Sequence, residues 1–164
     1  MGMLAHYYQI NKEQTGNVLQ KICSSSNNFY EVISNREGIQ NHLDIDRSWL
    51  NLVEVFKDIH VDDLKPNIGE ITFYGNELNK SYEPDGLLNY TDFATVKKIN
   101  KYLKSIAIDN KDDFIKTFNS TQFTRFGEID YSEYYDYLFL HLMNLKIFYL
   151  QCEKEESGVI ISIG

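Results

Sequence analysis

The stretch that decides the fold is Leu43-Asp44-Ile45-Asp46-Arg47-Ser48-Trp49-Leu50, which holds the one tryptophan of the chain. From here apolar side chains recur at three- and four-residue steps, which places them on one helix face. These are Ile45, Trp49, Leu52, Val53, Phe56 and Ile59. Asp44 or Asp46 is expected to cap this helix, because a carboxylate accepts unpaired amide hydrogens and meets the positive end of the helix dipole. We predict a helix that reaches about Ile59.

Residues upstream of this stretch predict a strand and two short helices. Residues 4–10 are rich in aromatic and β-branched side chains, which favours a strand covered on both faces. Asn11 is expected to cap a short helix, and a second short helix is predicted over residues 29–34. Residues 60–89 lose the helical period and contain both prolines, so we predict a long loop there, with a short strand at Ile71–Tyr74. Loops of this length are often functional.

Helical signals return downstream. Thr91 or Asp92 is expected to cap a helix through Ile106, and Asp109-Asn110 to cap a shorter one. Residues 130–133 have the spacing of a capping box, and the helix predicted to follow, over residues 134–152, is apolar nearly all round, as is typical of a helix enclosed by neighbours. Residues 159–163 predict a covered strand.

These elements predict a single α+β domain over residues 1–164. We expect a small sheet that includes the N-terminal and C-terminal strands, about five to six helices packed against it, and a long buried C-terminal helix. A chain of 164 residues is long enough for a sizeable core.

The net charge of the chain limits the classes of molecule that it is expected to bind. It carries 24 acidic and 16 basic residues, for a formal net charge of −8. This balance argues against nucleic acid and anionic membranes, which bind clustered Lys and Arg. In most acidic proteins the charge serves only solubility, but it can also steer a basic protein as partner. No apolar run approaches the ~20 residues of a membrane span. Cys23 and Cys152 are too few for a disulfide framework, and no leader peptide is evident, so we expect a cytoplasmic protein.

Two groups of residues raise the possibility of chemistry. Asp58, His60 and Asp62, followed by Asp63, would share one side of an extended segment and could bind a metal. A helix end that runs into a polar loop accounts for the same residues, and we favour that interpretation. His42 with Asp44 or Asp46 could form a general base. No nucleophile motif accompanies it, so we expect no catalytic residue, metal or cofactor.

Other aromatic and imidazole side chains are ambiguous. His6 and His141 lie in apolar surroundings, where a histidine is more often a neutral core residue than a ligand. The many tyrosines suit packing and interfaces equally well. If a partner site exists, we expect it at the long loop, with Tyr74, Tyr82 and Asp85.

Four short segments of the chain fit a known pattern: the opening Met1-Gly2-Met3, the Leu43–Trp49 element, the segment Leu87–Thr91 and the closing strand from Val159 to Gly164. On these segments the chain resembles the YfbM-like family, small bacterial proteins of unknown function. This sequence departs from the family pattern in the middle, where the family tends to carry a glycine-rich loop. The resemblance implies a mixed α and β domain of a bacterial cytoplasm and brings no catalytic residues.

Three functions remain open at this point. The first is a non-enzymatic protein-interaction module that neutralises a basic partner, such as a toxin of nuclease type. The alternative is a metal-assisted or hydrolase-like enzyme that uses the region from His42 to Asp63 and the loop of residues 60–89. The third is a structural or oligomer-forming role, which the aromatic content would suit.

Overall fold

A five-stranded sheet lies at the centre of the molecule. The computed structural model describes residues 3–78, 86–120 and 134–164. All strands pair antiparallel in the order β2-β1-β5-β4-β3. Their bounds are β1 Ala5–Ile10, β2 Ile39–Asp44, β3 Asn76–Glu77, β4 Leu87–Thr91 and β5 Gly158–Ile163. Because β1 and β5 are neighbours, the predicted sheet of N-terminal and C-terminal strands is confirmed.

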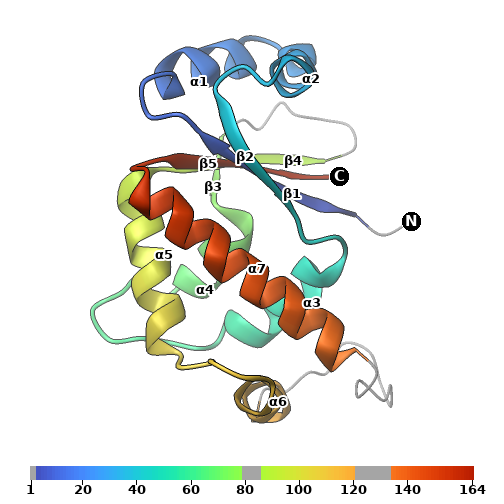
Figure 1. Cartoon of the computed structure of the whole chain (residues 1–164), viewed down its shortest axis with the longest axis vertical. Helices are drawn as coiled ribbons and strands as arrows, with labels where there is room; N and C mark the ends of the chain where they lie inside the picture. Colours follow the sequence, from blue (N-terminus) through green and yellow to red (C-terminus); the bar gives the residue numbers. More distant parts are fainter. Residues whose placement is uncertain (1–2, 79–85, 121–133) are drawn as a thin grey trace.

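Helices cover both faces of the sheet. The helices are α1 Thr15–Ser24, α2 Ser26–Asn35, α3 Ser48–Phe56, α4 Ile68–Tyr74, α5 Phe93–Ser105, α6 Lys111–Ser120 and α7 Tyr135–Lys154. In Figure 1, α1 and α2 lie above the sheet and the other helices below it. Alternation along β1 supplies both layers, since Tyr8 and Ile10 pack with α1 and α2 while Ala5 and Tyr7 join the larger core. The α+β class is confirmed, and the described part has seven helices where five or six were expected.

Two of the predicted helix caps are confirmed. The Asp92 carboxylate accepts the Thr95 backbone N–H at 2.7 Å at the start of α5. Asn110 Oδ1 accepts the Asp113 N–H at 3.0 Å at the start of α6. The predicted capping box of residues 130–133 lies outside the described residues.

The prediction that Asp44 or Asp46 caps the tryptophan helix is wrong. Asp44 ends β2, and its carboxylate accepts the Asp46 N–H at 2.7 Å. Asp46 has φ 49°, and α3 begins at Ser48 without a side-chain cap. The short Asp44 side chain accepts a hydrogen bond from the backbone two residues further along the chain. This interaction forms a turn and does not cap the helix. The helix also ends at Phe56, three residues before the expected end.

The strand predicted at Ile71–Tyr74 is helix α4. β-branched and aromatic residues favour a strand locally. Here, however, side chains from distant parts of the sequence donate hydrogen bonds to the backbone carbonyls at the end of a helix and stabilise it. The Tyr149 hydroxyl donates to the Thr72 carbonyl at 2.8 Å and the Tyr7 hydroxyl to the Phe73 carbonyl at 2.9 Å. The Asn89 amide donates to the Tyr74 carbonyl at 2.6 Å. Three carbonyls at the end of α4 are thus satisfied by side chains far away in the sequence.

Strands β2 and β4 were not predicted as strands. β2 is an edge strand, and four of its six residues are exposed, so it lacks an apolar period. β4 falls at the end of the segment expected to be loop, and it pairs with β5 over its whole length.

The long C-terminal helix is confirmed as α7, but the described part of the chain encloses only one side of it. Its inner face buries Leu138, Leu142, Leu145, Phe148, Tyr149 and Cys152. On the other side, Leu140, Ile147 and Leu150 are exposed. The near-uniform apolar character that predicted full enclosure therefore leaves a hydrophobic outer surface in this chain.

Candidate functional site: a cleft beside β2

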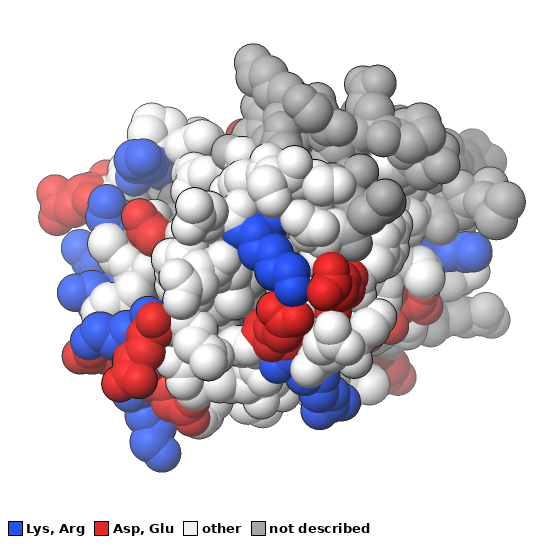
Figure 2. All heavy atoms as spheres, turned by 90° about the horizontal axis from the view of Figure 1, so that it is seen from above, with Lys and Arg blue, Asp and Glu red and all other residues white. Residues whose placement is uncertain are grey.

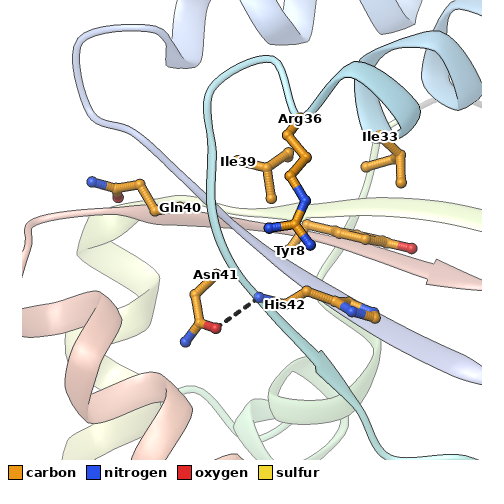
Figure 3. A pocket seen from close by; sticks show the side chains of 7 residues that line it. All are labelled: Tyr8, Ile33, Arg36, Ile39, Gln40, Asn41 and His42. Atoms are coloured by element: carbon orange, nitrogen blue, oxygen red, sulfur yellow. Dashed lines mark hydrogen bonds between the residues drawn. The ribbon is translucent and has the colours of Figure 1, made fainter.

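A cleft of about 340 Å³ lies between β2 and the C-terminal end of α2. We call it the β2 cleft. Figure 3 shows the seven residues that line it: Tyr8, Ile33, Arg36, Ile39, Gln40, Asn41 and His42. They come from three places in the chain, namely β1, the end of α2 with the turn that follows it, and β2. The antiparallel pairing of β1 and β2 brings them together.

Two rings form one wall of the cleft. Tyr8 lies directly opposite His42 in the β1–β2 register, so their side chains share one face of the sheet. The rings stack with centroids 4.7 Å apart and planes 11° apart. The edge of the Phe29 ring packs against Tyr8 from α2. Tyr8 is therefore buried and fixed, whereas His42 is exposed to the cleft.

The next β1–β2 pair on the same face of the sheet adds a second imidazole and a carboxylate. His6 lies opposite Asp44, with 3.8 Å between His6 Nδ1 and Asp44 Oδ2. His42 Nε2 lies 3.3 Å from the same His6 Nδ1. Because both neighbours meet one nitrogen, the ring of His6 does not connect Asp44 to His42 through its two opposite nitrogens, as a catalytic relay requires. The sequence-based pairing of His42 with Asp44 is replaced by a histidine pair with Asp44 beside it.

The surroundings of His42 favour its neutral form. Burial lowers the pKa of His42, and the neighbouring His6 and Arg36 lower it further, while Asp44 partly opposes them. At neutral pH the imidazole is therefore uncharged, and Arg36 is the permanently charged residue among the seven that line the cleft.

Arg36 occupies a backbone position that suits glycine. It follows α2 with φ 53° and ψ 35°, the left-handed conformation. Its N–H donates to the Ile33 carbonyl at 3.1 Å, and the Glu37 N–H donates to the Val32 carbonyl at 3.0 Å, which together form a Schellman motif. Glycine is the usual residue there, since a side chain in this conformation costs roughly 1 kcal/mol. An arginine is strained at this position, and strain of this kind is common at functional sites.

The guanidinium of Arg36 has no ion-pair partner within the described part of the chain. Glu37 is its sequence neighbour, but Lys21 Nζ holds the Glu37 carboxylate at 2.9 Å. In Figure 3 the Arg36 side chain extends from the turn toward the Tyr8 and His42 rings. A cation thus lines the cleft, and no acidic side chain in the described part of the chain forms an ion pair with it.

Comparison with known proteins places the chain in a family. A family profile described as "Domain of unknown function (DUF1877)" matches residues 1–162. The chain belongs to this DUF1877 family. The fold is also similar to the crystal structure of YfbM from Escherichia coli, a protein of unknown function, with a TM-score of 0.62, 18% identity, and coverage of 98% of this chain and 99% of that one. The predicted YfbM-like relationship is confirmed, and at this identity the structural likeness shows the fold alone. A search of curated proteins found no match.

In this DUF1877 member, Tyr74 is the one predicted partner residue that lies in the described structure. Tyr74 ends α4 and is partly buried, with its ring edge-on to Trp49 at 5.4 Å. Tyr82 and Asp85 lie outside the described residues. The partner site at Tyr74, Tyr82 and Asp85 stays a prediction.

The residues considered for a metal site are not gathered either. The ring nitrogen Nδ1 of His60 lies 3.1 Å from the Pro66 carbonyl oxygen, which occupies it locally. Within residues 3–78, 86–120 and 134–164, no three His, Cys, Asp or Glu side chains are placed to hold a metal ion. Asp58 and Asp62 lie in the segment that follows α3, and a metal site there stays a hypothesis.

His141 and Asp46 form a smaller cluster with Tyr137. The Tyr137 hydroxyl donates to Asp46 Oδ2 at 2.9 Å, and its ring lies edge-on to His141 at 4.5 Å. Burial lowers the pKa of His141, as expected of a neutral, partly buried histidine. Burial also raises the pKa of Tyr137 to about 12. This cluster ties α7 to the turn after β2.

Sequence reasoning found one lining residue of the β2 cleft, His42, and missed Arg36. Arg36 lies in a polar turn that ends a helix, where an arginine is ordinarily a solvated surface residue. Its conformation could have been suspected only from its place at the end of α2. Its place beside Tyr8 and His42 in the cleft lining depends on how α2 packs on the sheet, which residue order does not show.

The surface charge is mixed on the face above the sheet. Figure 2 shows Lys and Arg side chains interspersed with Asp and Glu there, without a broad patch of one sign among the coloured residues. The acidic excess of the chain is therefore not concentrated on the described part of this face. In the described part, no helix has the length and apolar character that crossing a membrane requires.

Proposed function

We propose that this protein is a binding protein whose β2 cleft takes a small organic anion. The observation that carries the proposal is Arg36, a cation that lines the cleft, has no ion-pair partner among the described residues, and is held in a conformation that glycine would adopt with less strain. A carboxylate or phosphate on the ligand would complete the guanidinium, whose planar fork matches either group.

The hydrogen-bonding groups at the rim support an anion. Asn41 Oδ1 accepts the His42 backbone N–H at 2.9 Å, and Gln40 Oε1 accepts the Ser157 hydroxyl at 3.0 Å. Each amide oxygen thus accepts one hydrogen bond within the protein, which orients the amide, while the amide N–H groups of Asn41 and Gln40 have no acceptor among the described residues and can donate to a ligand. Donors complement an anion and not a cation.

The apolar lining indicates the rest of the ligand. Ile33 and Ile39 line the same cleft and are partly buried, beside the Tyr8 and His42 rings. A ligand with a hydrocarbon or aromatic body next to its anionic group would cover these side chains. The class we infer is an aryl or short alkyl carboxylate or phosphate.

The alternative of a metal-assisted or hydrolase-like enzyme has less support. Among the described residues, no serine, threonine or cysteine side chain is hydrogen-bonded to His6 or His42. A base without a bonded nucleophile fits ligand binding better than acyl transfer.

Protein interaction is the second candidate function. The net charge of −8 supports the predicted basic partner, and the exposed Leu140, Ile147 and Leu150 of α7 offer an apolar contact surface. Neutralisation of a basic toxin stays a prediction, which a pull-down at low and high salt would test.

Benzoate is the probe that tests the cleft. In an ¹⁵N-labelled NMR titration we expect saturable shifts of the Arg36, Asn41 and His42 amide signals with benzoate and with phenyl phosphate. Benzyl alcohol keeps the ring without the charge, and benzylamine reverses the charge, so both should leave these signals nearly unmoved. Equal shifts with benzyl alcohol, or no saturable shift with either anion, would contradict the proposal.

Acidification should strengthen the binding of benzoate. The pKa of His42 lies below its ordinary value of 6.5, so the ring gains its proton only as the pH falls through and below that region. The second positive charge beside Arg36 should then raise the affinity roughly fivefold, about 1 kcal/mol, once the pH is low enough for the ring to be protonated. Calorimetric titration of wild type and His42→Gln checks this, and the variant should show a flat profile.

The same proton should lower the stability of the free protein. Because the folded state binds the His42 proton more weakly than the unfolded state does, this contribution is present above the ordinary pKa and is lost as the pH falls below it. Opposite pH trends for affinity and for stability are therefore expected, and a parallel fall of both would contradict the role of His42.

A further inference from the structure

The outer face of α7 carries an apolar stripe that is exposed in the described structure. Of the seven exposed large hydrophobic side chains in the described part, Leu140, Ile147 and Leu150 lie on α7, and Leu140 and Ile147 are 57% and 64% exposed. Met143, partly exposed, lies between them. The steps of three, four and three residues place all four on one face. In Figure 1, α7 crosses the front of the molecule with no other element drawn over it.

The spacing of the apolar residues along the stripe is the same in both directions. Leu140 and Leu150 lie five residues on either side of position 145, and Met143 and Ile147 lie two residues on either side. In an antiparallel pair of identical helices crossing there, Leu140 would face Leu150 of the other copy, and Met143 would face its Ile147. A twofold interface has this reciprocity, in which residue i meets j and j meets i.

The charges at the two ends of α7 fit the same arrangement. Asp136 and Lys154 are each nine residues from position 145, so each would lie opposite the other's equivalent in the second copy. Both are exposed. Asp136 pairs with Lys111 at the surface, and Lys154 has no ion pair within the described residues. Within one chain their Cα atoms are separated by about 27 Å of helix, so they cannot meet there.

We propose that two copies of this protein associate through the outer faces of their α7 helices. The two helices run antiparallel and cross at the level of residue 145 along the helix axis. The occupant is a second copy and not an unrelated helix, because each apolar residue of the stripe finds an apolar counterpart and each end charge finds its opposite in the same register. The interface lies on the side of the sheet away from the β2 cleft, so it does not depend on the proposed ligand.

Analytical ultracentrifugation of the full chain tests the pairing. We expect wild type to sediment at twice the monomer mass of 19.2 kDa at micromolar concentration. Ile147→Glu should weaken the dimer by more than roughly tenfold, since it places charges next to the twofold axis. Tyr30→Glu, which alters a residue of equal exposure, 64%, on α2, is the matched control and should leave the mass unchanged.

Charge exchange identifies the partner residues. Asp136→Lys and Lys154→Asp should each weaken the dimer, because each places like charges at both ends of the interface. The double variant should recover most of the wild-type affinity, which only contact between copies can explain. A wild-type monomer at 100 µM, a dimer that Ile147→Glu leaves intact, or no recovery in the double variant would each overturn the proposal.

Discussion

Replacing Gly69 with alanine is expected to destabilise the protein by about 3 kcal/mol, because overpacking against backbone cannot be relieved by a side-chain rotation. A Cβ at Gly69 would lie 2.2 Å from the Phe56 carbonyl oxygen and 3.0 Å from the Tyr102 hydroxyl. The Tyr102 hydroxyl donates to that same carbonyl at 2.8 Å. Relief therefore requires α4 to move away from α3 and to break a buried hydrogen bond.

Gly16 provides the matched control for this substitution. It lies in helix α1, and an added Cβ would meet no atom within 4 Å. Gly16→Ala should therefore be neutral or should stabilise by up to about 1 kcal/mol, since alanine is the better helix former. Urea unfolding of both variants measures their free energies of unfolding. Equal values for Gly69→Ala and Gly16→Ala would contradict the close contact between α3 and α4 at Gly69.

The sequence predicted elements whose signals are local. The stripe of Trp49, Leu52 and Phe56 gave α3, and Asp92 gave the start of α5, because periodicity and capping act within a few residues. The ends of the chain were correctly placed in one sheet. These signals do not depend on which segments meet in space.

Elements that depend on distant partners were missed. Helix α4 ends on donors from Tyr7, Asn89 and Tyr149, which no window around Ile71 contains. Strand β2 is polar because it lies at a sheet edge, so its apolar pattern is weak. The cap assigned to Asp44 failed because a turn competes for the same carboxylate. Tertiary context decided each of these cases.

The candidate site shows the same division. His42 and Asp44 were considered for chemistry from the sequence, but the structure pairs His42 with Tyr8 and His6 across two strands. Arg36 gave no signal, because its importance comes from a left-handed backbone and from the diversion of Glu37 to Lys21. Neither the backbone conformation of Arg36 nor the ion pair between Glu37 and Lys21 can be predicted from the order of residues alone.

Arg36→Gly is expected to abolish most of the anion binding while preserving or raising stability. Removing the guanidinium deletes a charge-assisted contact, which should weaken benzoate at least tenfold, roughly 1.5 kcal/mol or more. Glycine relieves the left-handed strain at φ 53°, so the free energy of unfolding should rise by about 1 kcal/mol. If Arg36 served mainly to pack against its neighbours, Arg36→Gly would instead lower the free energy of unfolding.

Two variants separate these effects. Ala107→Gly relieves a similar left-handed residue, at φ 49°, outside the cleft, so it should alter stability and leave benzoate binding unchanged. Arg36→Lys keeps the charge but loses the planar fork, so its affinity should fall between those of wild type and Arg36→Gly.

Isothermal titration of benzoate into wild type and Arg36→Gly at pH 6.5, with the thermal unfolding of both proteins recorded alongside, tests the central claim most directly. The β2 cleft predicts saturable binding by wild type, at least a tenfold loss in Arg36→Gly, and a melting temperature for the variant that is unchanged or higher. Equal affinities, no binding by wild type, or a lower melting temperature for Arg36→Gly would contradict it.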